Sequence, residues 1–163
     1  MPAAALRDPA NLVNPRAIWY WTIRALLFWV VIIAVEVIVW VANPGDRTPI
    51  GVVLAVTALV AIAHLIVMPR WRFRVHRWET TDTAVYTRAG WFNQERRIAP
   101  LSRIQTVDTD RGPLEQLFRL ANVTVTTASA AGPLKIRGLA PADADRLVAE
   151  LTRITAESTG DAT

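Results

Sequence analysis

The side chains that could carry acid–base or nucleophilic chemistry are few and isolated in this sequence. Cysteine is absent, which excludes thiolate nucleophiles, thiolate metal ligands and disulfides. His64 falls in an apolar run, His76 stands alone, and no glycine-rich phosphate loop is present. Asp108 and Asp110 alternate and would share one face of a strand, but exposed strand-end residues are the simpler interpretation. We therefore predict no catalytic residues, no cofactor and no metal.

Basic residues are the second group of side chains that could have a functional role. The chain has 18 Lys and Arg against 14 Asp and Glu, and much of the excess follows an apolar run. Near a membrane surface each such residue gains about 1 kcal/mol from anionic lipid. We predict that they dock on lipid rather than on nucleic acid. The candidate headgroup contacts are Arg70, Arg72, Arg74, Arg77, Arg96 and Arg97.

Three ionisable residues, Arg24, Glu36 and His64, lie inside apolar runs, where such residues are functional candidates by default. In straight helices Arg24 and His64 lie about 6–9 Å from one end of the runs, so they can snorkel or face one another. Glu36 lies roughly 20 Å from His64, which excludes a proton relay between them within one chain. Glu36 could instead be protonated or snorkel, contact a partner helix or a second copy, or serve transport in an oligomer.

The elements that must position these residues begin with two apolar runs, Ile18–Ala42 and Ile50–Met68. As helices they would extend roughly 37 and 28 Å, against a hydrocarbon core of about 30 Å. The short linker between them contains proline and glycine and allows only an antiparallel return. We predict a transmembrane helical hairpin at residues 18–68, preceded by a separate segment at residues 1–17.

Charges flanking the hairpin predict its orientation. Arg7 and Arg16 precede the first run, and four arginines closely follow the second, whereas Arg47 in the linker is offset by Asp46. Cytoplasmic loops carry the excess of basic residues. We therefore predict a multi-pass protein of the plasma membrane with both termini in the cytoplasm.

Residues 69–157 are enough for one small domain. Trp71, Phe73 and Val75 alternate with polar residues, which predicts a strand that starts directly at the membrane. Leu114–Ala121 has the spacing of a short helix. Further strands are predicted at residues 84–88, 91–98, 104–109, 123–127 and 134–137.

A helix closes the predicted domain. It begins near Pro141, and its apolar face includes Leu147 and Leu151. Residues 158–163 are small and polar and are predicted to be a disordered tail. The fold class is thus a membrane hairpin plus a cytoplasmic α+β domain, mainly β, with antiparallel sheets or an open barrel and a C-terminal helix.

Two stretches resemble a known family. Residues 98–107, IAPLSRIQTV, resemble the Ile-Pro-x-x-x-Ile-Gln-x-Val segment of bacterial pleckstrin-homology-like (PH-like) membrane proteins of the YdbS-like group, with Ala99 as an insertion. Residues 111–121, RGPLEQLFRLA, resemble the family's most specific stretch. The motif residues are Ile104, Gln105, Arg111, Gly112, Pro113, Leu114, Glu115, Leu117 and Phe118.

The resemblance implies a PH-like fold, with two antiparallel sheets closed by a helix, and it implies little about activity. Many family members occur with a longer companion that carries repeated PH-like domains. The motif has a structural interpretation, in which Gly112-Pro113 forms a turn, the apolar residues fill the core, and Glu115 pairs with an arginine. A ligand or partner contact is the alternative.

These observations predict a non-enzymatic membrane protein that presents a PH-like domain at the inner leaflet for protein–protein interaction or assembly. Its expected partners are membrane lipids and either a companion membrane protein with PH-like domains or a second copy of the chain. A sensor of anionic lipid headgroups is the first alternative. A subunit of a small transport assembly is the second.

Overall fold

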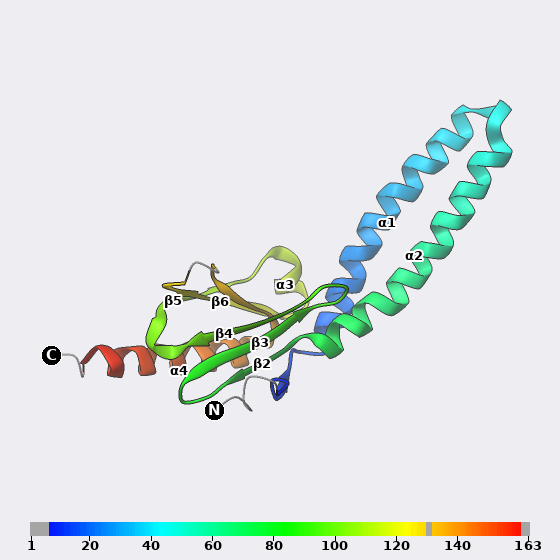
Figure 1. The fold of residues 1–163 in the computed structure, drawn as a ribbon. Helices are drawn as coiled ribbons and strands as arrows, with labels where there is room; N and C mark the ends of the chain where they lie inside the picture. The colour runs from blue at the N-terminus through cyan, green and yellow to red at the C-terminus, as the bar shows by residue number, and fades with distance from the viewer. Residues whose placement is uncertain (1–6, 130–131, 161–163) are drawn as a thin grey trace.

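The computed structural model describes residues 7–129 and 132–160, as a long helical hairpin joined at its foot to a domain of strands and helices (Figure 1). The elements in chain order are β1 (Asn11–Leu12), α1 (Arg16–Ala42), η2 (Pro44–Asp46), α2 (Arg47–Val75), β2 (Arg77–Thr80), β3 (Ala84–Gly90), β4 (Gln94–Pro100), η3 (Leu101–Arg103), β5 (Ile104–Asp110), α3 (Pro113–Leu117), β6 (Ala121–Thr127), β7 (Leu134–Leu139) and α4 (Pro141–Gly160).

Helices α1 and α2 expose large apolar side chains along their length. Ile38 and Leu59 are 67% and 69% exposed, and both helices are long and apolar enough to cross a membrane. A water-soluble protein would bury such a continuous surface, whereas a bilayer covers it. The predicted hairpin is present, and α2 extends past the predicted end at Met68.

The strand that we predicted from Trp71 is wrong, because α2 continues through Pro69 to Val75. Met68 and Val75 are also seven residues apart, which is two turns of one helical face. Both are buried at 6% and 5% exposure, while Trp71, at the edge of the same face, is 48% exposed. A strand would have placed Trp71, Phe73 and Val75 on one side, whereas a helix turns Phe73 away from the other two. The alternation was therefore a coincidence of helical spacing.

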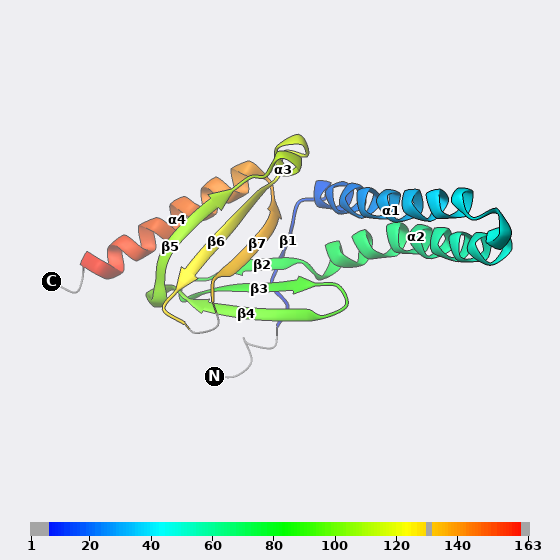
Figure 2. The same ribbon diagram turned by 90° about the horizontal axis from the view of Figure 1, so that it is seen from above.

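The domain has two antiparallel sheets, ordered β1-β2-β3-β4 and β5-β6-β7, and α4 runs along β5 (Figure 2). Their core includes Val85, Val123 and Leu147, each no more than 2% exposed, so the apolar faces of both sheets meet the apolar face of α4. This arrangement confirms the predicted fold class. Helix α4 extends beyond the predicted end at residue 157, and the last part of the predicted tail, residues 161–163, lies outside the described residues.

The segment before α1 is part of the domain. Asn11 in β1 lies opposite Trp78 in β2, so the chain pairs with the sheet before it enters the hairpin. The backbone N–H of Asn14 then donates to the carbonyl of Gly138 in β7, at 2.8 Å. Gly138 has φ +78°, and a Cβ there would lie 3.1 Å from the Cβ of Ala17. Only glycine allows this close approach of α1 to β7.

A second apolar cluster joins the foot of the hairpin to the domain. Its buried members come from the N-terminal segment, both membrane helices and the loop before β6. They are Val13, Ala17, Tyr20, Trp21, Ala25, Met68 and Leu120. Both the start of α1 and the last turns of α2 are therefore packed against the domain.

Candidate functional site

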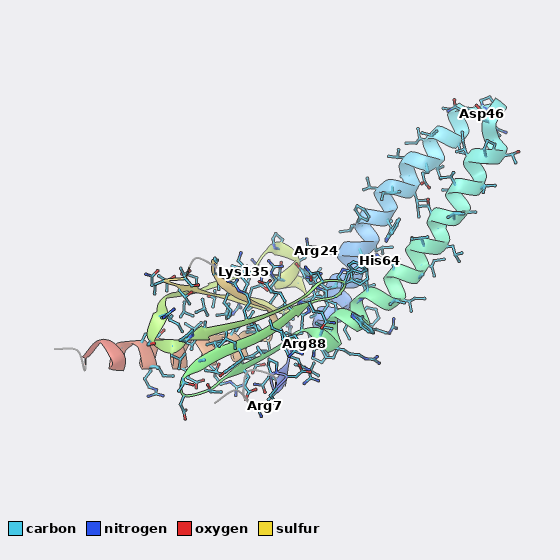
Figure 3. All side chains as sticks on the ribbon, viewed as in Figure 1. Arg7, Arg24, Asp46, His64, Arg88 and Lys135 are labelled. Carbon is cyan, nitrogen blue, oxygen red and sulfur yellow. The ribbon has the colours of Figure 1, made fainter. Side chains whose placement is uncertain are left out.

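Two adjoining cavities, of about 330 and 320 Å³, lie between the foot of the hairpin and the domain. Both are lined by Arg72, Lys135 and Arg137. One also takes in Arg97 from β4, and the other takes in Arg24 from α1. We call these five residues and the space between them the basic cleft. Figure 3 labels Arg24 near the foot of the hairpin and Lys135 on the upper face of the domain.

The alternation of β7 places two of these cations. Leu134 and Ile136 are 2% and 3% exposed and face the core, so Lys135 and Arg137 project from the other face. Within the described part of the chain, the side chains of Lys135 and Arg137 have no hydrogen bond and no ion pair. Two neighbouring cations without carboxylates make this face attractive to an anion.

Arg72 enters the cleft from the last turns of α2. Its guanidinium lies over the ring of Trp21, 4.7 Å from the ring centroid. Its Nε atom is buried and has no hydrogen-bond partner in the described structure. A buried guanidinium nitrogen without a partner is costly, and an anionic oxygen in the cleft would remove that cost.

A chain of hydrogen bonds fixes Arg24 at the edge of the cleft. Arg24 Nη1 donates to the hydroxyl oxygen of Tyr20 at 2.9 Å, and that hydroxyl donates to Glu115 Oε1 at 2.6 Å. Burial alone would raise the pKa of Glu115, but hydrogen bonds from Tyr20, from the backbone and from Asn122, together with the charge of Arg24, outweigh it, and the pKa lies below its ordinary value. Glu115 therefore stays ionised and ties α3 to α1.

His76 lines the cleft without adding charge to it. The ring packs against Trp21, with 4.9 Å between centroids, and Nδ1 lies 2.8 Å from the carbonyl oxygen of Arg72. Because a carbonyl only accepts, Nδ1 carries the proton. Burial, followed by the nearby charge of Arg72, lowers the pKa of His76 to about 4. His76 is therefore neutral at physiological pH.

The carboxylates that line the cleft already have partners. Glu115 accepts from Tyr20, Asp110 accepts from the side-chain amide of Asn122 at 2.9 Å, and Glu95 lies 3.6 Å from Arg97. No group of three or more His, Cys, Asp or Glu within residues 7–129 and 132–160 could hold a metal ion. The arrangement is suited to binding an anion.

The structure brings together only two of the six predicted headgroup arginines, Arg72 and Arg97. Arg97 is held by the carbonyls of Gly132 and Pro133, at 2.8 and 2.5 Å. The others lie outside the cleft: Arg70 donates to the carbonyl of Ile66, Arg74 is exposed, Arg77 donates to the carbonyl of Pro9, and Arg96 pairs with Asp8 at 3.0 Å. The sequence reasoning missed Lys135 and Arg137, although the alternation Leu-Lys-Ile-Arg carried the signal.

The family motif contributes to the joint between domain and hairpin. Leu114 and Phe118 pack against the second apolar cluster, and a Cβ on Gly112 would lie only 2.6 Å from Glu115 Oε2. The expected pairing of Glu115 with an arginine is replaced by its bond to Tyr20. The expected core position of Leu117 is wrong, because this side chain is 71% exposed.

The remaining motif residues lie along β5 and at the start of α3. Ile104 packs against the domain core, and Gln105 is exposed. Arg111 lies 3.7 Å from Asp145 of α4, and Pro113 is the first residue of α3. These contacts hold β5 and α3 in place around the domain.

The polar residues inside the hairpin find partners between the two helices. Glu36 Oε1 accepts from the Thr57 hydroxyl at 2.8 Å, and Arg47 lies over the Trp40 ring. Its second carboxylate oxygen has no partner in the described structure. His64 Nδ1 accepts from Trp29 Nε1 at 2.9 Å, so His64 does not pair with Arg24.

Comparisons with known proteins match both the hairpin and the domain. The family model described as Bacterial PH domain matches residues 17–155. The UPF0699 transmembrane protein YdbS of Bacillus subtilis (strain 168) is 30% identical over 154 residues, which cover 91% of this chain and 96% of that protein. No solved structure matches the chain. The membrane location and the predicted resemblance are confirmed, and the chain belongs to the bacterial PH domain family.

Proposed function

We propose that this protein is a non-enzymatic membrane receptor whose PH-like domain binds the phosphate of an anionic lipid headgroup at the inner leaflet. One observation carries the proposal: Arg72, Lys135 and Arg137 line one cleft, and none of them has a carboxylate partner in the described structure. Guanidinium and ammonium groups are the side chains that bind phosphate oxygens most strongly.

The position of the cleft supports a lipid as the source of this phosphate. Arg24 lies in the first turns of α1 and Arg72 in the last turns of α2, so both membrane helices contribute to the site. The two cavities are within the size range of small-molecule sites. A headgroup at the bilayer surface can therefore reach the cleft while its acyl chains stay in the membrane. The basic residues that flank the hairpin support the cytoplasmic side for the domain.

The test uses the whole chain, because β1 and the foot of α1 complete the domain. The protein is solubilised from vesicles of phosphatidylcholine and phosphatidylglycerol, and the retained phosphatidylglycerol is measured by mass spectrometry. Charge-assisted hydrogen bonds contribute about 1.5–3 kcal/mol each, so the double variant Lys135→Gln/Arg137→Gln should bind at least roughly tenfold more weakly.

Arg146→Gln/Arg153→Gln is the matched control, because it removes the same charge from α4. This control should retain the lipid as the unchanged protein does. Equal retention by the two double variants would refute the proposal. Excess inorganic phosphate at constant ionic strength should leave retention unchanged, and displacement would point to a free anion as the ligand instead.

A second candidate function is assembly with another PH-like domain. Among the described strands, β5 pairs only with β6. Its other edge has no paired strand along seven largely exposed residues, and such an edge can accept a strand from a partner. The partner would be a companion membrane protein with PH-like domains or a second copy. Two differently tagged copies that fail to co-purify from co-expressing cells would exclude the second copy. A transport role needs several hairpins, so the same negative result would also exclude transport by an assembly of copies of this chain.

A further inference from the structure

The turn between β3 and β4 carries the most exposed large apolar side chain of the described residues. Phe92 is 91% exposed, and its neighbour Trp91 is 40% exposed. We call Trp91, Phe92 and Asn93 the aromatic turn. Neither the domain core nor the proposed headgroup site accounts for two adjacent aromatic side chains at the tip of a hairpin.

The aromatic turn lies against the part of α2 that enters the membrane. Trp71 Nε1 donates to the carbonyl oxygen of Trp91 at 3.0 Å, and the ring of Trp91 lies 5.5 Å from the ring of His64. His64 precedes Met68, the last residue of the apolar run, by one turn, or about 6 Å. The turn therefore extends past the foot of the hairpin to the level of the membrane-spanning helices.

The backbone holds the aromatic turn in a fixed shape. Gly90 has φ +107°, and a Cβ there would lie 1.9 Å from the carbonyl oxygen of Asn93. Only glycine fits this close return of the chain. Gly90 also pairs with Gln94, so the β3–β4 ladder is complete up to the turn. Trp91 and Phe92 thus lie at the tip of a fully paired β3–β4 hairpin.

We propose that the aromatic turn inserts into the interfacial region of the leaflet next to the domain and acts as a second membrane anchor beside the helical hairpin. Lipid is its occupant, because the turn continues the apolar surface of α2 at the depth of His64. Tryptophan is suited to this region, since its ring is apolar and its N–H stays near water. The carbonyl of Trp91 is already hydrogen-bonded, which removes one cost of inserting the backbone.

Insertion of the aromatic turn also defines how the basic cleft is approached. Gly90 and Asn93 line the same cavity as Arg72 and Lys135. The part of the cleft wall formed by this turn would then lie within the leaflet, so that a ligand would enter the cleft from the bilayer. The insertion itself rests on the aromatic residues and stands whether or not the cleft binds a headgroup.

The chain contains no cysteine, which allows a direct depth measurement. Phe92→Cys is labelled with an environment-sensitive nitrobenzoxadiazole dye, and the full-length protein is placed in phosphatidylcholine vesicles. Asp82→Cys, in the exposed β2–β3 turn at the opposite end of these strands (Figure 1), is the aqueous control. Leu59→Cys, exposed on α2, is the membrane reference.

We expect the label at residue 92 to have blue-shifted emission and to be quenched by spin-labelled lipids, as at residue 59. The label at residue 82 should be quenched by aqueous iodide instead. Iodide quenching at residue 92 equal to that at residue 82 would overturn the proposal.

A second measurement keeps Phe92 in place. The Trp91→Phe variant and the unchanged protein are compared in vesicles of brominated lipid, which quenches tryptophan by contact. If Trp91 is inserted, the difference between their emission spectra, which isolates one of the seven tryptophans, shrinks in brominated lipid. A difference spectrum of the same size in brominated and ordinary lipid would also overturn it.

Discussion

His76 should make the domain less stable in mild acid. Burial and the charge of Arg72 lower its pKa from 6.5 to about 4. Between these values the unfolded chain binds a proton that the folded chain does not, so stability is full above pH 6.5 and falls as the pH drops towards 4. The complete effect is about 3 kcal/mol, and about 2 kcal/mol of it falls between pH 7 and pH 5.

The perturbation is His76→Phe, which keeps an aromatic ring against Trp21 and cannot titrate. The carbonyl of Arg72 still accepts from the backbone N–H of residue 76, at 2.9 Å, so the substitution leaves no unpaired carbonyl. The midpoint of thermal unfolding is measured at pH 7 and pH 5 in detergent. For a chain of this size, 2 kcal/mol corresponds to about 4–8 °C.

Between pH 7 and pH 5, we expect the unfolding midpoint of the unchanged protein to fall by about 4–8 °C more than that of His76→Phe. Nitrogen NMR of the two imidazoles should show that His76 remains neutral at pH 5.5. The same loss of midpoint in both proteins, or a protonated His76 at pH 5.5, would refute the reasoning.

Three further predictions concern packing and can be checked by the same unfolding midpoint. Gly138→Ala should cost more than Gly132→Ala, because both residues have a positive φ, worth about 1–2 kcal/mol, but only Gly138 also approaches Ala17; equal losses would mean that this approach can relax. Tyr20→Phe and Glu115→Gln should be coupled by about 0.5–3 kcal/mol in a double-mutant cycle, since their side chains share one hydrogen bond, and additive losses would argue against that bond. Leu147→Ala, in the core, should cost about 2–5 kcal/mol, whereas Leu117→Ala, at an exposed position, should change stability by less than about 0.5 kcal/mol; a large loss at Leu117 would reveal a buried contact in the membrane.

Much of the fold could be predicted from local patterns. The hairpin follows from the length of two apolar runs, and α4 follows from a regular apolar face. The error at Trp71 arose where two periods coincide over a few residues, because Trp71, Phe73 and Val75 alternate while Val75 also continues a helical face from Met68. Packing against the domain decides between strand and helix here, and the residues that provide this packing are distant in the sequence.

The candidate site was only partly predictable, because its residues come from distant segments. Arg72 and Arg97 were identified from their charge and their place near the membrane. Lys135 and Arg137 follow the turn after β6 and showed no link to the hairpin until the sheets were assembled. Topology, rather than residue type, brings these four cations into one cleft.

The pairing of β1 with β2 has a consequence for how this protein is made. Asn11 leaves the ribosome long before its partner Trp78, and the whole hairpin is synthesised between them. The first strand must therefore wait while both helices enter the bilayer, and the sheet can be completed only after they have done so. Assembly of the domain thus reports on successful membrane insertion, and a chain that fails to insert its hairpin would display an unpaired sheet edge to cellular quality control.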